Sequence, residues 1–302
     1  MQLDKTRIAV RERGVLDTLD LSLHVARVYA LPLMVTMAMG VIPLMVINHL
    51  LLDWMLLAAD NELDYPFRFV YNMTLLVFIE APLASIFASS YLGQVVFLDR
   101  PRLRDVVVDV GKMFPRIVWC QLLVRGIAPA WLVLFSLDRY GEFNGWLEGF
   151  VLVALALGAG IFRALRPFIN EIVLLERNPL SSKNKRVMTV GRRSSMLHGA
   201  SGGDLFLRAI VAGLIGVLLV LSLYGTFMFP WGVMRNNWSQ PMLMIRFGLP
   251  LAMWITTGYF TVFRFLSYLD VRIRQEGWEV ELRLRAEAAR LAQDLSQYPS
   301  KG

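Results

Sequence analysis

The sequence predicts an all-α membrane protein, a polytopic bundle of six transmembrane helices with an interfacial helix before it and a charged cytoplasmic helix after it. Three observations predict this fold class. The 302-residue chain is 56% hydrophobic and only 18% charged, with a mean hydropathy of +0.51, whereas soluble domains are nearer one quarter charged. The apolar residues form long blocks, and Lys and Arg concentrate in every second connection between the blocks.

Six apolar blocks are long enough to cross a bilayer as helices. A helix rises about 1.5 Å per residue, so a hydrocarbon core of about 30 Å needs about 20 residues. The blocks lack the alternation of a membrane β-strand, and a helix satisfies its own backbone in lipid. The fourth block is the weakest, and the return of apolar sequence at 172–175 suggests a helix that continues past the membrane as one rod. The predicted spans are 28–52, 69–98, 117–137, 146–162, 205–229 and 242–266.

The placement of Lys and Arg predicts the orientation. The stretches before the first span, between the second and third, between the fourth and fifth, and after the sixth are rich in basic residues, whereas the other three connections are not. Because basic residues are retained on the cytoplasmic side, both termini are predicted to be cytoplasmic, in a plasma or inner membrane. The chain then divides into a cytoplasmic or interfacial helix (1–27), a six-helix transmembrane domain (28–266) and a cytoplasmic helical tail (267–302).

Two helices are predicted outside the spans. In the stretch 16–27, Leu16, Leu19, Leu23 and Ala26 recur at helical spacing, which is typical of a helix lying in the membrane interface; a helix packed on the loops is an equally good interpretation. The stretch 270–296 is highly charged and has a narrow apolar seam. It could dock a partner, but a solvated extension of the last span is favoured.

Charge inside a span is costly and usually has a reason, and two charged residues within predicted spans stand out. Glu80 lies in the second span and Arg125 in the third, at nearly equal estimated depths on adjacent antiparallel helices. They are a candidate intramembrane ion pair. A structural clamp between the two helices is favoured over a proton or substrate site, although Pro82 and Pro129 would loosen both helices nearby.

Motifs for enzyme chemistry are absent from the sequence. One cysteine and three widely separated histidines give no zinc-ligand spacing, and there is no HExxH, GxSxG or P-loop pattern. We therefore expect no catalytic, cofactor-binding or metal-binding residue, and no enzyme. The formal charge of +7 is explained by membrane insertion and does not indicate nucleic acid. The expected partners are the bilayer, anionic lipid headgroups next to the basic stretches, and other subunits of a membrane complex.

Two passages carry a family resemblance. RPFINEIVLLERNPL (166–180) and FLSYLDVRIRQEGWEVEL (265–282) together resemble the six-helix membrane domain that accompanies some bacterial glycerophosphodiester phosphodiesterases and more often stands alone as an uncharacterised membrane protein. The match of the basic loop at 192–204 is poor. The resemblance implies the six-helix fold but no activity, because the phosphodiesterase chemistry of that family belongs to a separate soluble domain.

The second passage places four charged residues just inside the membrane surface. Asp270, Arg272, Arg274 and Glu276 are predicted to bridge to the basic stretches as a latch, or, as the second choice, to contact lipid headgroups. The function expected from all of this is a non-enzymatic component or anchor of a membrane complex. The alternative is a transporter or lipid-handling protein that uses Glu80 and Arg125.

Overall fold

The computed structural model describes residues 14–57, 66–96, 101–123, 127–140, 145–184, 186–199, 202–236 and 242–276. Within these ranges the regular secondary structure is helical throughout, and two of the segments, η2 and η3, are π-helical turns. The elements are α1 (Val15–Val28), α2 (Ala30–Leu57), α3 (Phe67–Ala84), α4 (Ile86–Val95), α5 (Leu103–Val118), η2 (Trp119–Leu123), α6 (Ile127–Tyr140), α7 (Gly145–Leu165), α8 (Ile169–Leu174), α9 (Val190–Gly199), α10 (Gly202–Arg235), η3 (Met244–Gly248) and α11 (Leu249–Glu276).

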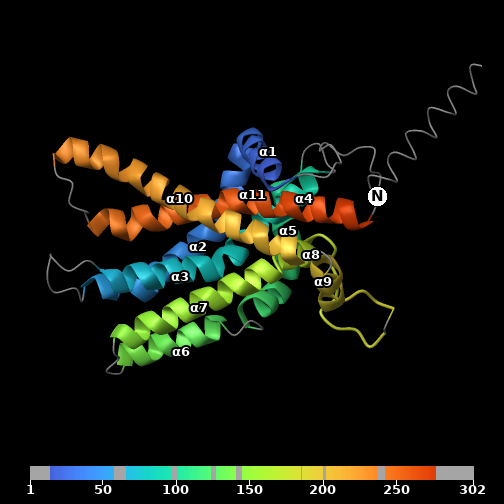
Figure 1. Ribbon diagram of the computed structural model, residues 1–302, viewed down its shortest axis with the longest axis horizontal. Helices are drawn as coiled ribbons and strands as arrows, with labels where there is room; N and C mark the ends of the chain where they lie inside the picture. The colour runs from blue at the N-terminus through green and yellow to red at the C-terminus, as the bar shows by residue number, and fades with distance from the viewer. Residues whose placement is uncertain are drawn as a thin grey trace, which may run out of the picture.

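The long helices lie roughly side by side along the long axis of the molecule (Figure 1). The short helices α8 and α9 gather at one end, together with the start of α10 and the end of α11. We call this the basic end, because the connection that includes α8 and α9 carries five described arginines, Arg166, Arg177, Arg186, Arg192 and Arg193. The opposite end is formed by the end of α2, the start of α3 and α7, and the end of α10.

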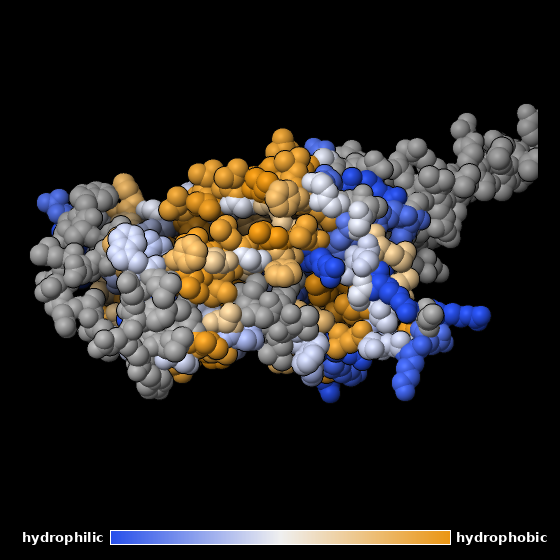
Figure 2. Space-filling view, turned by 60° about the horizontal axis from the view of Figure 1, so that its bottom comes forward, coloured by the Kyte–Doolittle hydropathy of each residue, from blue (hydrophilic) through white to orange (hydrophobic). Residues whose placement is uncertain are grey.

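Four of the helices are long and apolar enough to cross a membrane, which indicates a membrane protein and confirms the all-α prediction for the described residues. α10 alone has 34 residues and is therefore about 51 Å long. Figure 2 shows the apolar surface as a band along the middle of the molecule, with hydrophilic residues toward the basic end. The four helices are Ala30–Leu56, Phe67–Val95, Glu148–Leu165 and Gly202–Arg235, which correspond to the first, second, fourth and fifth predicted spans.

The four helices differ in the share of their residues that is buried. In the most apolar part of the α3–α4 stretch 78% of the residues are buried, compared with 11% in the most apolar part of α10. The exposed helices are apolar on the outside, as lipid contact requires. α11 resembles α3–α4 in burial, with side chains such as Phe265 and Tyr268 inside the core. The bundle is therefore built around α3–α4 and α11.

The prediction of one rod through the fourth span is wrong. α7 ends at Leu165 and the chain restarts as α8 at Ile169. Pro167 lies between the two helices, and a proline disfavours helical backbone in the residue before it. Ile172 and Val173, the apolar residues that suggested a continuous helix, are fully buried in the core at the basic end.

The helix predicted at 16–27 is present as α1, and it packs against α11 through a hydrogen bond of 3.1 Å from the Tyr259 hydroxyl to the Leu19 carbonyl. Leu19 is buried, but Leu16 and Leu23 remain more than half exposed. The expected apolar face is therefore shared between the bundle and the surroundings. Of the stretch predicted as a charged helix at 270–296, the part beyond Glu276 lies outside the described residues.

Candidate functional site

The second apolar helix is broken at FIEAPLAS, and the break organises the polar interior. Pro82 has no N–H, so the carbonyl of Phe78 one turn earlier loses its helical partner. α3 ends at Ala84 and α4 begins at Ile86, with Ser85 between them at φ −83° and ψ −2°. A break in a helix this buried must find other donors for its freed carbonyls.

Side chains from two other helices supply those donors. The Arg163 guanidinium of α7 donates to the carbonyl of Phe78 and, over 3.3 Å, to that of Ile79. Its Cζ also lies 4.1 Å from the centre of the Phe78 ring. The amide of Asn170 on α8 donates to the Pro82 carbonyl over 2.7 Å. The short buried helix α8 is thus fastened to the break in the central helix.

An ion pair between α8 and α11 lies beside the same break. Glu171 is completely buried, and its Oε1 accepts from Arg264 Nε over 2.8 Å. Arg264 Nη2 also donates to the hydroxyls of Ser85 and Ser89, at 3.0 and 3.1 Å. A buried charge pair needs such additional hydrogen bonds to offset its lost hydration, and the two serines of the central helix provide them on the arginine side.

The hydrogen bonds of the carboxylate and amide oxygens in this cluster are less complete than those of the arginine. Gln121 Nε2 donates to Asn170 Oδ1 over 2.6 Å. Among the described residues, however, Glu171 Oε2 and Gln121 Oε1 are buried without a hydrogen-bond partner. Such atoms call for a water molecule, ion or ligand. We call the whole set the helix-break cluster, and it consists of Ser85, Ser89, Gln121, Arg163, Asn170, Glu171 and Arg264.

A glycine on α2 allows the neighbouring helix to approach the break. A Cβ placed on Gly40 would lie 2.1 Å from the carbonyl oxygen of Ala84. A side chain there would force α2 away from the last turn of α3. Small residues let membrane helices come this close, so Gly40 allows α2 to pack directly against the break.

Of the candidate intramembrane ion pair, only Glu80 lies within the described residues. Glu80 Oε2 accepts a hydrogen bond of 2.9 Å from Asn48 on α2. Arg125 lies outside the described residues, so the proposed ion pair stays a prediction. Within the described residues, the hydrogen bond of the Glu80 carboxylate is with the first predicted span.

The four latch residues lie at the basic end, where α11 meets α9 and α10. Asp270, which is 1% exposed, accepts from Arg208 of α10 over 3.0 Å and from Arg274 over 2.6 Å. Arg208 also pairs with Asp204 at 3.0 Å. The carboxylate on α11 is thereby tied to the first turns of α10.

The other two latch residues join α11 to α9 and the end of the α8 segment. Arg272 pairs with Glu276 over 2.8 Å, and Glu276 also binds Arg193 of α9. Arg193 makes a fork to Glu176 with contacts of 2.7 and 2.8 Å. The Tyr268 hydroxyl donates to Glu176 over 2.8 Å. We call these five residues the α9–α11 network.

The electrostatics of the α9–α11 network favour its charged form. Burial alone would raise the pKa of Glu276, but hydrogen bonds from Arg272 and Arg193 outweigh this effect and the pKa is lowered. The hydrogen bond to Glu176 raises the pKa of Arg193. Burial raises the pKa of Tyr268, so its hydroxyl remains protonated and can donate. The network is a fixed set of compensated charges.

The buried histidine at this end has a packing role. The Phe168 N–H donates to His198 Nε2 over 3.3 Å, so that nitrogen carries no proton. Nδ1 then holds the proton and donates to the Ser194 carbonyl at 2.6 Å. Both ring nitrogens are occupied by backbone groups, which leaves neither for proton transfer. In the described part of the chain, no cluster of three His, Cys, Asp or Glu side chains could hold a metal ion.

Sequence reasoning missed most of the helix-break cluster. Arg163 follows the fourth predicted span and Arg264 lies at the end of the sixth, and both were counted with the neighbouring basic stretches. Asn170 and Glu171 were read as part of a family-like motif. One signal was present, because Asn170 and Glu171 are a polar pair inside the apolar run FINEIVLL. Comparison with protein-family models, curated proteins and solved structures gives no match for the chain.

Proposed function

We propose that the chain is a six-span protein of the plasma or inner membrane with both termini in the cytoplasm. The alternation of basic and non-basic connections supports this topology. The arrangement in Figure 1 agrees, because the four apolar helices run along one axis and the basic segment that follows α7 lies at the same end of the molecule as the end of α11. α1 would then lie at the cytoplasmic interface with Leu16 and Leu23 toward lipid.

The third and sixth spans of this topology are not among the four helices described above. The third would be formed by the end of α5, by η2 and by α6, and residues 124–126 between η2 and α6 lie outside the described ranges. The sixth would be η3 with the first part of α11, whose apolarity is reduced by Arg264 and several threonines. A helix in the centre of a bundle faces other helices more than lipid, so it tolerates polar residues that pair inside the protein. The burial of α11 supports this interpretation.

The function that the geometry supports best is a non-enzymatic component or anchor of a membrane complex. The observation that carries this proposal is the pinning of α3–α4, α7, α8 and α11 to one another by the helix-break cluster. Arg163 and Asn170 donate hydrogen bonds to backbone carbonyls, and Arg264 pairs with Glu171 and donates to two serines. Polar groups committed in this way hold a fixed architecture. The expected partners remain neighbouring subunits and anionic lipid headgroups.

A transporter or lipid-handling protein is the second candidate, and two observations favour it. Transporter sites are often built at broken helices near the middle of the membrane, and the break after Pro82 is of this kind. Glu171 Oε2 is also buried without a partner among the described residues. The similarity to the membrane domain associated with phosphodiesterases is compatible with either candidate and remains a proposal.

The topology is tested with single cysteines in a Cys120→Ser background. Glu62→Cys is expected to react with a membrane-impermeant maleimide in intact cells, because position 62 lies in a predicted outer connection. Lys183→Cys is expected to react only after the cells are opened. Labelling of position 183 from outside would refute the orientation.

The two functional candidates are separated by neutral substitutions at the buried carboxylates. For an architectural component, Glu171→Gln lowers the amount of folded protein in the membrane, and any loss of cell phenotype follows that amount. For a transporter, Glu171→Gln or Glu80→Gln abolishes the phenotype while the folded amount is unchanged. The folded amount is measured as the monodisperse fraction after extraction in mild detergent, with Arg186→Gln as the surface control.

A further inference from the structure

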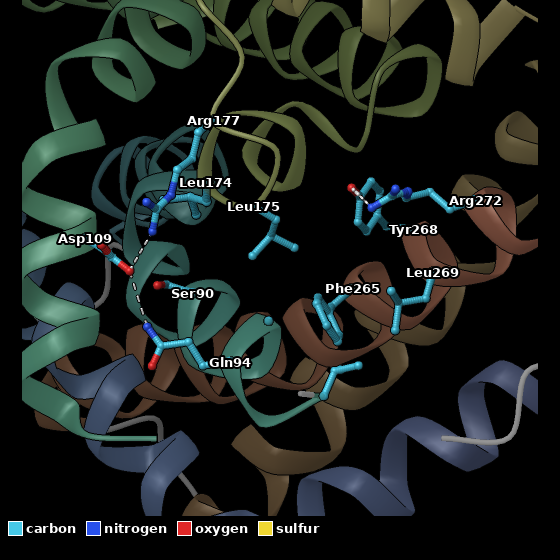
Figure 3. Close-up of a pocket in the computed structure, with 12 residues that line it drawn as sticks. Ser90, Gln94, Asp109, Leu174, Leu175, Arg177, Phe265, Tyr268, Leu269 and Arg272 are labelled. Carbon is cyan, nitrogen blue, oxygen red and sulfur yellow. Dashed lines mark hydrogen bonds and ion pairs between the residues drawn. The ribbon is translucent and has the colours of Figure 1, made fainter. Parts of the chain in front are cut away.

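A small cavity lies at the basic end, next to the α9–α11 network. Its volume is about 210 Å³, and it is lined by α4, α5, α11, the end of α8 and the segment that follows α8 (Figure 3). That is room for about seven water molecules. The cavity is too small for a whole lipid or a drug-sized ligand, and it suits a small polar group together with a few carbon atoms.

The wall of the cavity has two chemically distinct parts. Leu175 points into it from the segment after α8, and Phe265 and Leu269 of α11 form an apolar side (Figure 3). Arg177 and Arg272 bring guanidinium groups to the rim from two sides of the cavity that face each other. An occupant that satisfies both parts carries an anionic group at one end and hydrocarbon at the other.

Arg177 is the cation best placed to accept a new partner. Its side chain is 59% exposed, and its contact in the cavity is a 3.1 Å pair with Asp109, which is itself 31% exposed. An ion pair exposed to this degree is weak and is easily exchanged. Arg177 also has a left-handed backbone with φ of 54°, a strained conformation that is often found at binding sites. It turns the chain at the rim of the cavity.

The cation that can turn to an anion in the cavity is Arg177. Arg272 is already paired with Glu276 over 2.8 Å and lies 3.8 Å from Glu176, so it contributes to the wall and not to the exchangeable charge. Phosphate groups are well matched by guanidinium donors. Asp109 also accepts a long hydrogen bond from Gln94, at 3.5 Å, so it retains a partner if Arg177 turns toward a ligand.

We propose that this cavity binds the phosphate ester of a glycerophospholipid, with the first carbons of an acyl chain against Leu175, Phe265 and Leu269. The inference rests on the proposed topology, which puts the basic end at the inner membrane surface. There the cavity lies at the level where headgroup phosphate gives way to hydrocarbon, and the lipid enters from the leaflet with most of its tails remaining in the bilayer.

The test measures binding to the purified full-length chain in a neutral detergent with three probes. Dihexanoyl phosphatidylglycerol carries the phosphate and the tails, dihexanoylglycerol carries only the tails, and glycerol 3-phosphate carries only the phosphate. The expected result is saturable one-to-one binding of the first probe, read by native mass spectrometry and calorimetry, with at least tenfold weaker binding of the other two.

Two variants and two controls complete the experiment. Leu269→Trp fills the cavity and is expected to abolish binding, whereas Leu221→Trp on the lipid-facing side of α10 is not. Arg177→Gln is expected to weaken binding about tenfold, as loss of one partly exposed charged contact predicts. Arg186→Gln removes the same charge from the neighbouring surface and leaves binding unchanged. Because Arg177 is exposed, its substitution tests the site even if Leu269→Trp fails to fold.

Several results would overturn the proposal. Equal binding of dihexanoylglycerol would remove the role of the phosphate, and equal binding of glycerol 3-phosphate would identify a soluble phosphate ester as the occupant. Undiminished binding in Arg177→Gln would place the lipid elsewhere. Since these measurements are made in detergent, they are independent of the cysteine-labelling test, and a wrong topology and a wrong binding site are therefore recognised separately.

Discussion

The ion pair between Glu171 and Arg264 allows the sharpest test of the helix-break cluster. Arg264→Met removes the cation and leaves a carboxylate that has no exposed surface. Breaking a buried pair on one side costs about 3–5 kcal/mol.

The destabilisation expected when the carboxylate is removed instead of the cation is smaller. Glu171→Gln leaves Arg264 20% exposed and still bound to the hydroxyls of Ser85 and Ser89. Loss of one charged hydrogen bond then destabilises by about 1.5–3 kcal/mol. In the double variant neither charge is left unpaired, so its destabilisation is expected to be less than the sum of the single effects by about 1–3 kcal/mol.

The assay is equilibrium unfolding in mixed micelles at pH 7, with Arg186→Met as the control for loss of a surface arginine. The destabilisation by Arg264→Met is expected to exceed that by Glu171→Gln. Additive effects in the double variant, together with equal costs of the two single variants, would refute a buried ion pair at this position.

Three further perturbations test the surroundings of the cluster. Gly40→Val should destabilise by about 1–3 kcal/mol through overpacking against the central helix, measured by thermal unfolding in detergent, whereas Gly158→Ala meets no atom within 4 Å and should be neutral. Pro82→Ala restores the missing N–H, so Arg163→Met should cost about 1 kcal/mol less in that background; equal costs in a double-mutant cycle would show that the arginine does not serve the freed carbonyl. The lowered pKa of Glu276 means that its contribution to stability is present above its unfolded value of 4.5 and is lost as pH falls through the lower folded value. Between pH 6 and pH 3 the melting temperature should therefore fall less for Glu276→Gln than for the unsubstituted chain. An equal fall in both would contradict the network.

The sequence predicted the helices of the bundle better than the polar contacts in its centre. α2, α7 and α10 face outward over most of their surface, so lipid-like hydropathy had to appear in their composition, and they stand out as apolar blocks. The latch residues were also predictable as a group. Asp270 and Glu276 recur with arginines at helical spacing, and the structure brings both into contact with arginines of other helices, although their role remains a proposal.

The helix-break cluster could not be predicted from local pattern because its members come from five separate segments. Nothing near Arg163 in the sequence indicates a carbonyl freed by a proline about 80 residues earlier. Glu80 attracted attention as a charge within a span, yet the fully buried carboxylate is Glu171, in a short helix that hydropathy assigned to a connection. The relevant information is the three-dimensional path of the chain after Leu165.

The position of the polar residues explains why α11, although central, is less apolar than the outer helices. In a soluble protein the most buried helix is the most apolar, because water surrounds the rest. In lipid the exposed surface must be apolar, and the interior is the place where a charge such as Arg264 can find a partner. α11 therefore has a mixed composition, and it makes the contacts to Glu171, Ser85 and Ser89 that hold the break. A membrane span of low hydropathy can accordingly be the one on which the architecture of the bundle depends.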